Sequence, residues 1–315
     1  MDEHTAPGLA FLGPPGSYSH QCAVERFEDS VWYAAQSAIT DVFHAVSAEV
    51  PFAVIPQENS TYGSVVDTYD SLRSPEAGQS VFVRGELTLS VKHCLVVRSG
   101  VKLEDVRRVM SHEQALGQCS RFLSEHLPGV TRTKVPSTSA AASAVLCCGE
   151  GTDEPESAAI CSAHCASLFD GLEILRHDIQ DEASNTTRFY ILAKSLDAPL
   201  PGSSKQPRRQ RALIRVGNQV KLQREYEPPS TSHSTRIITS TLLTTFGCPP
   251  LRIDRRPSLN DIPFDDVYFL EVGDLTLPVT AATIKNCEEE WLQRLQNGVE
   301  GINAAGGEAT ILGVW

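Results

Sequence analysis

One stretch combines a predicted buried strand with a dense group of polar side chains: Asn185-Thr186-Thr187-Arg188-Phe189-Tyr190-Ile191-Leu192-Ala193. Residues 190–192 are aromatic, β-branched and aliphatic without a breaker, which predicts a buried strand. The polar, acidic residues 178–182 predict an exposed loop, so residues 185–189 stand at the mouth of that strand. The Arg188 guanidinium can bind a carboxylate through two parallel hydrogen bonds. Asn185 and Thr187 can donate neutral hydrogen bonds, and Phe189 can form an apolar wall. A turn with one surface arginine is the alternative.

The composition is that of an ordinary soluble globular protein, with 41% hydrophobic and 21% charged residues among 315. This length suffices for two or three domains. The net charge of −12 disfavours nucleic acid and anionic membranes as partners, although a local arginine can still bind an anionic substrate. No apolar run approaches the roughly 20 residues that span a bilayer, and the acidic start lacks the marks of a signal or transit peptide. We therefore expect a cytoplasmic protein.

The nine cysteines are an odd number and lie mostly in helical or apolar contexts. Cys161-x-x-His164-Cys165 is the one cluster that suggests a metal, but its alanine-rich surroundings predict a buried helix over residues 158–168. No second Cys/His pair follows at zinc-finger spacing. We expect reduced, buried thiols and no metal.

Units of strand, polar turn and helix recur along the chain, and each such turn is a candidate seat for an anion. The first has a strand at 9–12, a glycine turn at 13–19 and a helix at 20–27; a structural turn capped by Ser17 or Ser19 explains it equally well. In the second, the strand 52–56 runs into the polar residues 57–64 and a helix at 65–72. Ligands of open α/β sheets bind at such carboxyl ends of strands. Glu58 and Asn59 directly follow the apolar strand and need partners there.

The middle of the chain continues this pattern. Residues 86–97 predict one long strand that leaves one lobe for another. A strand at 107–110 leads into a helix that starts at 111, and a short strand at 134–135 leads into a turn that caps a helix at 140–146. Residues 199–211 lack apolar periodicity and predict a linker. Beyond it, strands at 212–216, 251–254, 266–272 and 309–314 and helices at 237–246 and 282–303 predict a βαββαβ unit with both helices on one face.

Six motifs, in this order, resemble those of prephenate dehydratases: GPPGSYSHQCA (13–23), PQENSTYGSVVDTYDSL (56–72), ELTLSVKH (86–93), SHEQALGQCSRFL (111–123), STSAAA (137–142) and IQDEASNTTRF (179–189). The βαββαβ tail resembles the ACT regulatory domain of the same enzymes. The resemblance implies an α/β catalytic domain at 8–195 with two lobes, similar to type II periplasmic binding proteins. Lobe 1 would hold about residues 8–86 and 179–195 and lobe 2 about 87–178. A linker at 196–210 and an ACT-like, ferredoxin-like domain at 211–315 would follow.

The resemblance also implies a lyase of phenylalanine biosynthesis, which removes carbon dioxide and water from prephenate to give phenylpyruvate. Formation of the aromatic ring drives this elimination, so no cofactor is expected. Arogenate dehydratase, which acts on the aminated substrate, is the closest alternative, and a non-catalytic small-molecule sensor is a more distant one. The intact hallmark at residues 185–189 argues against a sensor.

The site residues follow from the matching motifs. Thr187 would serve the leaving hydroxyl, Arg188 would hold a substrate carboxylate, and Phe189 would form the apolar wall. Glu58 would orient Asn59 or Thr187. The remaining catalytic candidates are Asn59 and Gln114, and the substrate-binding candidates are Ser17, Tyr18, Ser60, Ser111, Ser137, Thr138, Ser139 and Asn185.

The chain departs from the family pattern at three places. Gly-Thr-Phe-Ser is replaced by Gly16-Ser17-Tyr18-Ser19, which keeps a hydroxyl and a ring. Ser-His-Pro-Gln carries Glu113 in place of proline, and we expect this carboxylate to face solvent. In the tail, Glu-Ser-Arg-Pro is replaced by the regulatory candidates Asp254, Arg255, Arg256 and Pro257, and the polar insertion 218–234 replaces a Gly-Ala-Leu element. We therefore expect weak or absent regulation by phenylalanine, the candidate effector, and a homodimer or homotetramer paired through the tail.

Overall fold

The computed structural model describes residues 6–148, 155–202, 210–218, 250–260, 262–273 and 284–315, the last range with backbone alone up to 288. The chain forms two compact units. Unit 1 comprises residues 1–45, 53–65 and 87–189, and unit 2 comprises 46–52, 66–86 and 190–315. The predicted helix at 237–246 and nearly all of the insertion 218–234 lie outside the described residues. None of the helices in the described ranges is long and apolar enough to cross a membrane.

The first group of strands has the order β11-β3-β1-β2 within the larger of the two sheets, and most of its residues belong to unit 1. It is built from β1 (Gly8–Leu12), β2 (Trp32–Gln36), β3 (Phe52–Asn59) and β11 (Thr186–Ala193), with the short β4 (Gly63–Ser64) paired to β3. β1 and β2 are parallel and are joined through α1 (Tyr18–Phe27) and the 3-10 turn η1 (Glu28–Ser30). α2 (Ile39–His44) packs against both strands. β2 and α2 were not predicted from the sequence, because neither is strongly periodic.

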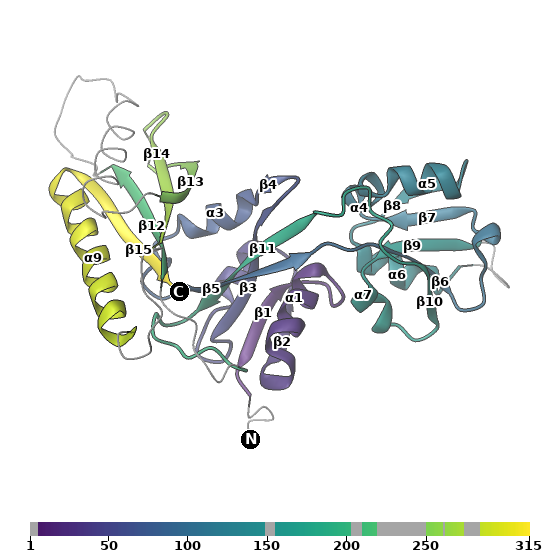
Figure 1. Cartoon of the computed structure of the whole chain (residues 1–315), viewed down its shortest axis with the longest axis horizontal. Coiled ribbons are helices and arrows are strands. Elements are labelled where there is room, and N and C mark those ends of the chain that lie inside the picture. The colour runs from purple at the N-terminus through teal and green to yellow at the C-terminus, as the bar shows by residue number, and fades with distance from the viewer. Residues whose placement is uncertain (1–5, 149–154, 203–209, 219–249, 261, 274–283) are drawn as a thin grey trace. The chain divides into compact units, whose positions relative to one another are not determined.

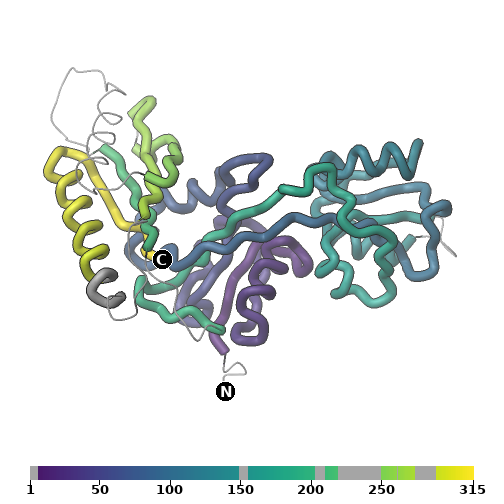
Figure 2. The backbone as a smooth tube through the Cα atoms, viewed as in Figure 1, coloured from purple at the N-terminus to yellow at the C-terminus, as the bar shows by residue number. Residues whose placement is uncertain are grey.

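The second sheet of unit 1 has the order β10-β6-β9-β7-β8. Its strands are β6 (Cys94–Arg98), β7 (Arg108–Ser111), β8 (Thr131–Lys134), β9 (Ser157–Cys161) and β10 (Leu172–Arg176). The chain enters this sheet after β5 and returns from it to β11, as Figure 2 shows. Its helices are α4 (Glu113–Gln118), α5 (Ser120–His126), α6 (Thr138–Val145) and α7 (Ala163–Ser167), with the 3-10 turn η2 (Leu103–Asp105) before β7.

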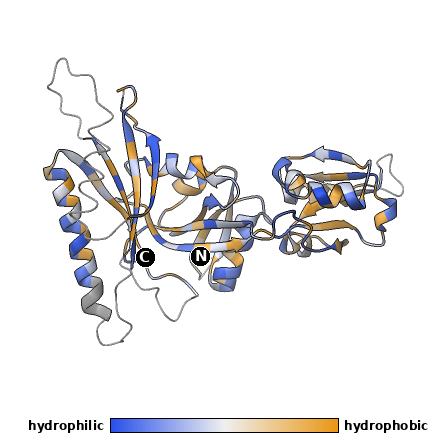
Figure 3. Cartoon of the chain, turned by 45° about the horizontal axis from the view of Figure 1, so that its top comes forward, coloured by the Kyte–Doolittle hydropathy of each residue, from blue (hydrophilic) through white to orange (hydrophobic). Residues whose placement is uncertain are grey.

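Helices cover both faces of this second sheet, because successive side chains of a strand point to opposite faces. Leu95 and Val97 of β6 share one core with Leu116 and Leu123 from α4 and α5. The intervening Val96 shares the other core with side chains of α6 and α7. Figure 3 shows the resulting concentration of hydrophobic residues in these strands.

Two predictions for this region were wrong. The predicted helix at 158–168 is the strand β9 followed by the short helix α7. β9 is buried along its whole length between β6 and β7, and this position overrides the helix propensity of its alanines. The predicted strand at 86–97 is two strands, since three residues separate the end of β5 (Phe82–Ser90) from the start of β6. The break occurs where the backbone N–H groups of Val91 and His93 bond to Asn185 and Gln180.

Unit 2 contains an antiparallel sheet of order β13-β14-β12-β15. The strands are β12 (Arg211–Asn218), β13 (Pro250–Pro257), β14 (Asp266–Gly273) and β15 (Gly307–Val314), and α9 (Ile284–Ala304) precedes β15. The four predicted strands and the second predicted helix are therefore present. Ile214 and Leu270 pack with Trp291 and Leu295 of α9, which covers one face.

The opposite face of this sheet carries α3 (Val66–Leu72). Tyr69 of α3 packs against Phe269 of β14, with ring centroids 5.2 Å apart. β15 also runs beside β5, where a Cβ atom on Gly313 would lie 2.1 Å from the Val83 carbonyl oxygen, so only glycine fits. Residues 66–86 thus pack with the tail, although the predicted lobe 1 had placed them with residues 8–65.

Candidate active site

A pocket with a volume of about 620 Å³ lies in unit 1. Its walls come from the β1–α1 turn, the β3–β4 turn, the segment before β6, the starts of α4 and α6, and β11. Among the predicted site residues, those that line it are Ser17, Tyr18, Asn59, Gln114, Ser137, Thr138, Thr187 and Phe189. Six motifs that are distant in sequence therefore supply one cavity.

Thr187 and Asn59 form the polar centre of this pocket. Asn59 Nδ2 donates to Thr187 Oγ1 at 3.0 Å and to Asn185 Oδ1 at 2.7 Å. Both amide hydrogens of Asn59 are thereby used, and the Thr187 oxygen is an acceptor in this contact. Thr187 makes no other side-chain hydrogen bond to the described residues, so its own hydroxyl hydrogen is available to a molecule in the pocket.

The other end of the Asn59 side chain shapes the wall next to it. Its Oδ1 accepts hydrogen bonds from the backbone N–H groups of Thr61 and Tyr62, at 2.9 and 3.1 Å. This is an Asx turn, which bends the chain from β3 into β4. One amide side chain therefore fixes both the turn and the Thr187 hydroxyl.

The alternation of side chains along β11 decides which hallmark residues reach the pocket. Thr187 and Phe189 line it, whereas Arg188 between them is half-buried and is not among the lining residues. The prediction that Arg188 holds a substrate carboxylate therefore lacks support from this geometry. Glu58 also lies outside the lining, since it precedes Asn59 on β3 and pairs with Ser64.

Four further predicted substrate-binding residues support the pocket from behind. Ser60 is clamped to β11, because its Oγ accepts from Thr186 N at 3.0 Å. Ser111 is fully buried and donates to the Ile160 carbonyl at 2.7 Å. Ser139 is buried and donates to the Pro15 carbonyl, and Asn185 is buried against Asn59. None of these four residues lines the pocket, and each makes a hydrogen bond within the protein, so their predicted contact with substrate stays a prediction that this geometry does not support.

The pocket contains helix N-termini in place of charged side chains. α1 begins after the cap Ser17, α4 after His112 and α6 after Ser137, and all three caps line the cavity. Helix N-termini present free N–H groups and partial positive charge to an anion. Among the described residues, no Asp, Glu, Lys or Arg lines the pocket. Glu113, next to His112, is exposed and pairs with Lys134, as expected from the sequence.

His93 and Gln118 are two of the pocket residues that the sequence analysis left unassigned. His93 is buried, and its Nε2 lies 2.6 Å from Gln118 Oε1 while its Nδ1 lies 2.7 Å from the Tyr18 hydroxyl. Burial lowers the pKa of His93, an effect that the hydrogen bond to Gln118 partly opposes, and burial raises the pKa of Tyr18 well above its ordinary value. All three side chains are therefore neutral near pH 7. The sequence could have pointed to His93 and Gln118 only through the two family-like motifs that contain them, at residues 86–93 and 111–123.

A family model described as prephenate dehydratase matches residues 9–196 of this chain. The chain belongs to the prephenate dehydratase family.

Individual relatives agree with this family assignment. Over 198 residues the chain is 36% identical to a bifunctional chorismate mutase/prephenate dehydratase of Pseudomonas aeruginosa, which covers 62% of this chain and 51% of that protein. Over 198 residues it is 35% identical to the chloroplastic arogenate dehydratase/prephenate dehydratase 2 of Arabidopsis thaliana, which covers 62% and 48%. The chain thus spans about half the length of these curated relatives.

The crystal structure of a prephenate dehydratase from Arthrobacter aurescens, in complex with L-Phe, matches with a TM-score of 0.73 and 24% identity. The match covers 98% of this chain and 89% of that one. This likeness confirms the predicted α/β fold class, whereas the ACT-like character of the tail stays a prediction.

In this member of the prephenate dehydratase family, the four regulatory candidates lie on β13 in unit 2. Arg256 forks onto Asp70 of α3, with Nε and Nη2 at 2.7 and 3.0 Å from the two carboxylate oxygens. Arg255 pairs with Asp266 at 3.3 Å, and Asp254 pairs with Arg252. The carbonyl of Pro257 accepts from Arg73. Each candidate therefore already has a partner within unit 2.

The cysteine cluster is divided between two elements. Cys161 ends β9, whereas His164 and Cys165 lie in α7. The described residues contain no group of three or more side chains placed to hold a metal ion.

Proposed function

We propose that this chain catalyses the decarboxylating dehydration of prephenate to phenylpyruvate. The observation that carries the proposal is the Thr187 hydroxyl, which is held by Asn59 and directed into a neutral pocket. In the reaction, the bond between the ring and its carboxylate breaks, and its electron pair enters the ring. The ring C–OH bond breaks at the opposite carbon, and the departing oxygen takes up one proton. Prephenate and a proton thus give phenylpyruvate, carbon dioxide and water.

Thr187 would donate to the departing oxygen in this step. An alkyl hydroxyl is too weak an acid to protonate it alone, so Thr187 acts as a hydrogen-bond donor or a proton relay. The Asn59 N–H stabilises negative charge that develops on the Thr187 oxygen, because it already points at that atom. Gln114 also lines the pocket and supplies a second neutral side chain close to the substrate.

The two carboxylates of prephenate would meet different surroundings. The departing carboxylate needs weak solvation, and Leu12, Val91 and Phe189 provide apolar lining. The retained carboxylate needs donors, and the N-terminal turns of α1 and α6 present free N–H groups next to Ser17 and Ser137.

Arogenate is the alternative substrate, as the name of the Arabidopsis relative includes arogenate dehydratase. Its extra ammonium group would favour a carboxylate partner. The described pocket lining has no carboxylate, which favours the keto acid prephenate.

For the tail, we propose an ACT-like domain that serves mainly to pair copies into a homodimer or homotetramer, with phenylalanine as a candidate ligand of weak regulatory effect. Support comes from the strand order of unit 2, which is that of a split βαβ sheet. A cytoplasmic location is supported by the seven described cysteines, all of which are free thiols, as a reducing compartment favours.

The test is a comparison of kcat/KM for prephenate and arogenate with the purified full chain, following phenylpyruvate and phenylalanine as products. We expect prephenate to be preferred by at least about tenfold, which corresponds to about 1.4 kcal/mol of discrimination. Preference for arogenate would transfer the proposal to the alternative substrate. Absence of turnover with both would overturn it.

A further inference from the structure

The turn between β1 and α1 carries the pocket residue Ser17 and is held by His20 of α1. The backbone N–H of His20 donates to Ser17 Oγ at 3.2 Å, and its imidazole Nδ1 accepts from Gly16 N at 3.1 Å. Ser17 Oγ itself donates to the Leu12 carbonyl at 2.6 Å. The imidazole stacks on Phe11, with ring centroids 4.7 Å apart. His20 is not among the pocket-lining residues, and the proposed mechanism gives it no task.

Helices of the second sheet of unit 1 contact the same turn. His164 Nε2, on α7, lies 3.3 Å from His20 Nδ1, and the two ring centroids are 5.2 Å apart. Ser139, on α6, donates to the Pro15 carbonyl within the turn. The β1–α1 turn therefore connects the first group of strands with the second sheet, and a pair of imidazoles forms part of that contact.

The hydrogen bonds at His20 determine where the imidazole protons are. A backbone N–H can only donate, so the bond from Gly16 requires a lone pair on His20 Nδ1 and places the ring hydrogen on Nε2. His164 Nε2 faces the same lone pair, so it carries a hydrogen and donates. A proton added to His20 would go to Nδ1 and would face both N–H groups. Both bonds therefore exist only while His20 is neutral.

The surroundings of the imidazole pair determine which ring is protonated first. The titratable groups that face the pair are Tyr33 of β2, Glu25 of α1 and Cys165 of α7. Burial lowers the pKa of both imidazoles; the charge of His164 lowers the pKa of His20 further, whereas Glu25 raises that of His164. Burial raises the pKa of Tyr33 to about 12, so its hydroxyl stays neutral. A first proton on His164 goes to its Nδ1 and leaves the Nε2 donor in place, whereas a proton on His20 breaks both bonds.

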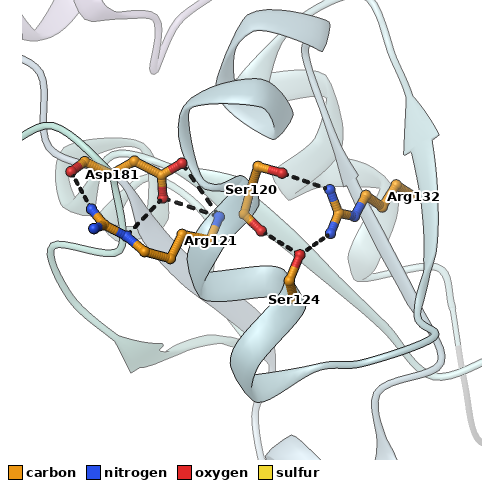
Figure 4. Close-up of polar contacts among 5 residues, drawn as sticks. All are labelled: Ser120, Arg121, Ser124, Arg132 and Asp181. Carbon is orange, nitrogen blue, oxygen red and sulfur yellow. Dashed lines mark hydrogen bonds and ion pairs between the residues drawn. The ribbon is translucent and has the colours of Figure 1, made fainter.

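A second contact between the same two parts of unit 1 contains no imidazole. The segment that returns to β11 is fixed to α5, since the Asp181 carboxylate accepts from Arg121 N at 3.2 Å and the Asp181 carbonyl accepts from Arg121 Nη2 at 2.6 Å (Figure 4). Arg132 steadies the same helix by donating to the hydroxyls of Ser120 and Ser124. Arginine keeps its proton throughout the range in which imidazoles titrate. Mild acid would therefore act on the β1–α1 turn and leave this contact closed.

We propose that His20 and His164 are positioning residues, which hold Ser17 and the first turn of α1 in the ligand-binding geometry only while His20 is neutral. Protonation of His20 releases the turn and weakens the binding of a carboxylate ligand at the N-terminus of α1. The proposal rests on the proposed function for the identity of that ligand. The contacts among the turn and the two imidazoles are independent of it.

The first experiment needs no ligand and no variant. Hydrogen exchange of the full chain, followed by NMR, gives the protection factor of the Gly16 amide, which should fall by up to about tenfold between pH 7.5 and 5.5, the limit set by an imidazole of ordinary pKa. Gly13 N is the matched control, because it donates to the Gln36 carbonyl at 2.8 Å and should keep its protection. Nitrogen-15 NMR should show His20 protonated at Nε2 and bare at Nδ1 at pH 7.5. An unchanged Gly16, an equal loss at Gly13, or a His20 protonated at Nδ1 would overturn the proposal.

The second experiment measures phenylpyruvate binding by calorimetry at pH 7.5 and 5.5. His93 and His112 also line the pocket, so the quantity compared among variants is the ratio of the two dissociation constants. His20→Asn keeps an acceptor near the position of Nδ1 that does not titrate, and its ratio should be about 2- to 10-fold smaller than that of the wild type. His164→Gln keeps an N–H near the position of Nε2 and should retain the wild-type ratio or exceed it. His44→Asn, at the exposed end of α2, is the matched control and should leave the ratio unchanged.

The two experiments separate this proposal from the proposed function. Equal ratios in His20→Asn and the wild type would overturn the positioning role, even where the Gly16 amide responds to pH. A wild-type chain whose Gly16 amide loses protection in acid as expected, but which does not turn over prephenate and binds phenylpyruvate with the expected ratio, would overturn the proposed function and leave the positioning role standing.

Discussion

The pocket of unit 1 and the sheet of unit 2 use charge in opposite ways. The described pocket lining has no charged side chain, and its polar groups are amides, hydroxyls, imidazoles and helix N-termini. The sheet of unit 2 is rich in arginines, and each has an acceptor: Arg211 bonds to Glu86 and Glu271, Arg215 to three carbonyls, and Arg256 to Asp70.

This difference separates anion binding from structural support, two roles of arginine that a sequence motif alone does not distinguish. An arginine near an expected anion site suggests anion binding, but the arginines of unit 2 hold secondary-structure elements to one another. Arg215 donates to the carbonyls of Leu72, Arg73 and Ser74, where α3 ends and leaves acceptors unsatisfied. An anion is expected in the pocket of unit 1, and the donors that the pocket offers to it are neutral groups.

The largest expected effect is that of removing the central neutral donor. Thr187→Val keeps the shape of the side chain and deletes its hydroxyl, so kcat should fall roughly 10²- to 10³-fold. Thr186→Val is the matched control, because the Thr186 side chain lies outside the pocket lining. An unchanged kcat for Thr187→Val would remove this residue from the mechanism.

The next effect concerns the charged region. Arg215→Met should lower the free energy of unfolding by about 1–3 kcal/mol, because three carbonyls at the end of α3 lose their donor. Arg255→Met should change it by less than about 0.5 kcal/mol, since that ion pair is exposed on the arginine side. Urea unfolding measures both. Equal losses for the two variants would contradict the structural role assigned to Arg215.

The neutral character of unit 1 can be tested with pH. Burial lowers the pKa values of His20, His93 and His164, so the folded protein resists protonation at these imidazoles. The unfolded chain takes up protons as the pH falls below about 6.5, which favours unfolding. The urea midpoint should therefore be higher at pH 7.5 than at pH 5.5, and the loss on acidification should be smaller in His164→Gln. A midpoint that rises on acidification would contradict the assignment.

A smaller effect is expected at the hallmark arginine. Arg188 is absent from the pocket lining, so Arg188→Lys should change the KM for prephenate by less than about threefold while lowering the melting temperature. A tenfold rise in KM with unchanged stability would show that Arg188 binds a substrate carboxylate, as the sequence suggested, and would break the contrast between the two regions.

Several residues predicted from the family motifs line the pocket. Thr187, Phe189 and Asn59 each adjoin an apolar strand, and Ser17 and Ser137 each precede a helix, so their local sequence context agrees with their positions in the structure. His93 and Gln118 were missed because their contact joins a strand break to the end of a helix and depends on tertiary packing. The same limit explains β9, whose alanines form a strand because β6 and β7 flank them.

The packing of residues 66–86 with the tail could also not be predicted from local sequence patterns. The helix α3 was predicted at nearly its observed limits, because its periodicity is local. Its partners Arg215, Arg256 and Phe269 lie more than a hundred residues away, and nothing in the helix itself identifies them.

The smallest expected effect is that of phenylalanine on activity. Arg255 and Arg256 are the cations that the sequence offers to an effector carboxylate, but both are already paired, with Asp266 and Asp70. Binding would have to break one of these pairs, and the insertion 219–234 lies outside the described residues. We expect phenylalanine to change kcat/KM by less than about twofold, well below the 5- to 150-fold range of typical allosteric coupling.

The full chain is the right material for this titration. A truncation near Lys194 would leave Tyr69 and Asp70 of α3 without Phe269 and Arg256, and would confuse lost regulation with lost stability. Asp70→Asn in the full chain is the sharper variant, because it weakens the hold on Arg256 and keeps the fold of the tail. If a paired Arg256 is what prevents effector binding, this variant should gain sensitivity to phenylalanine. Strong inhibition of the wild-type chain at micromolar phenylalanine would show that the tail binds this effector despite the pairing of Arg255 and Arg256.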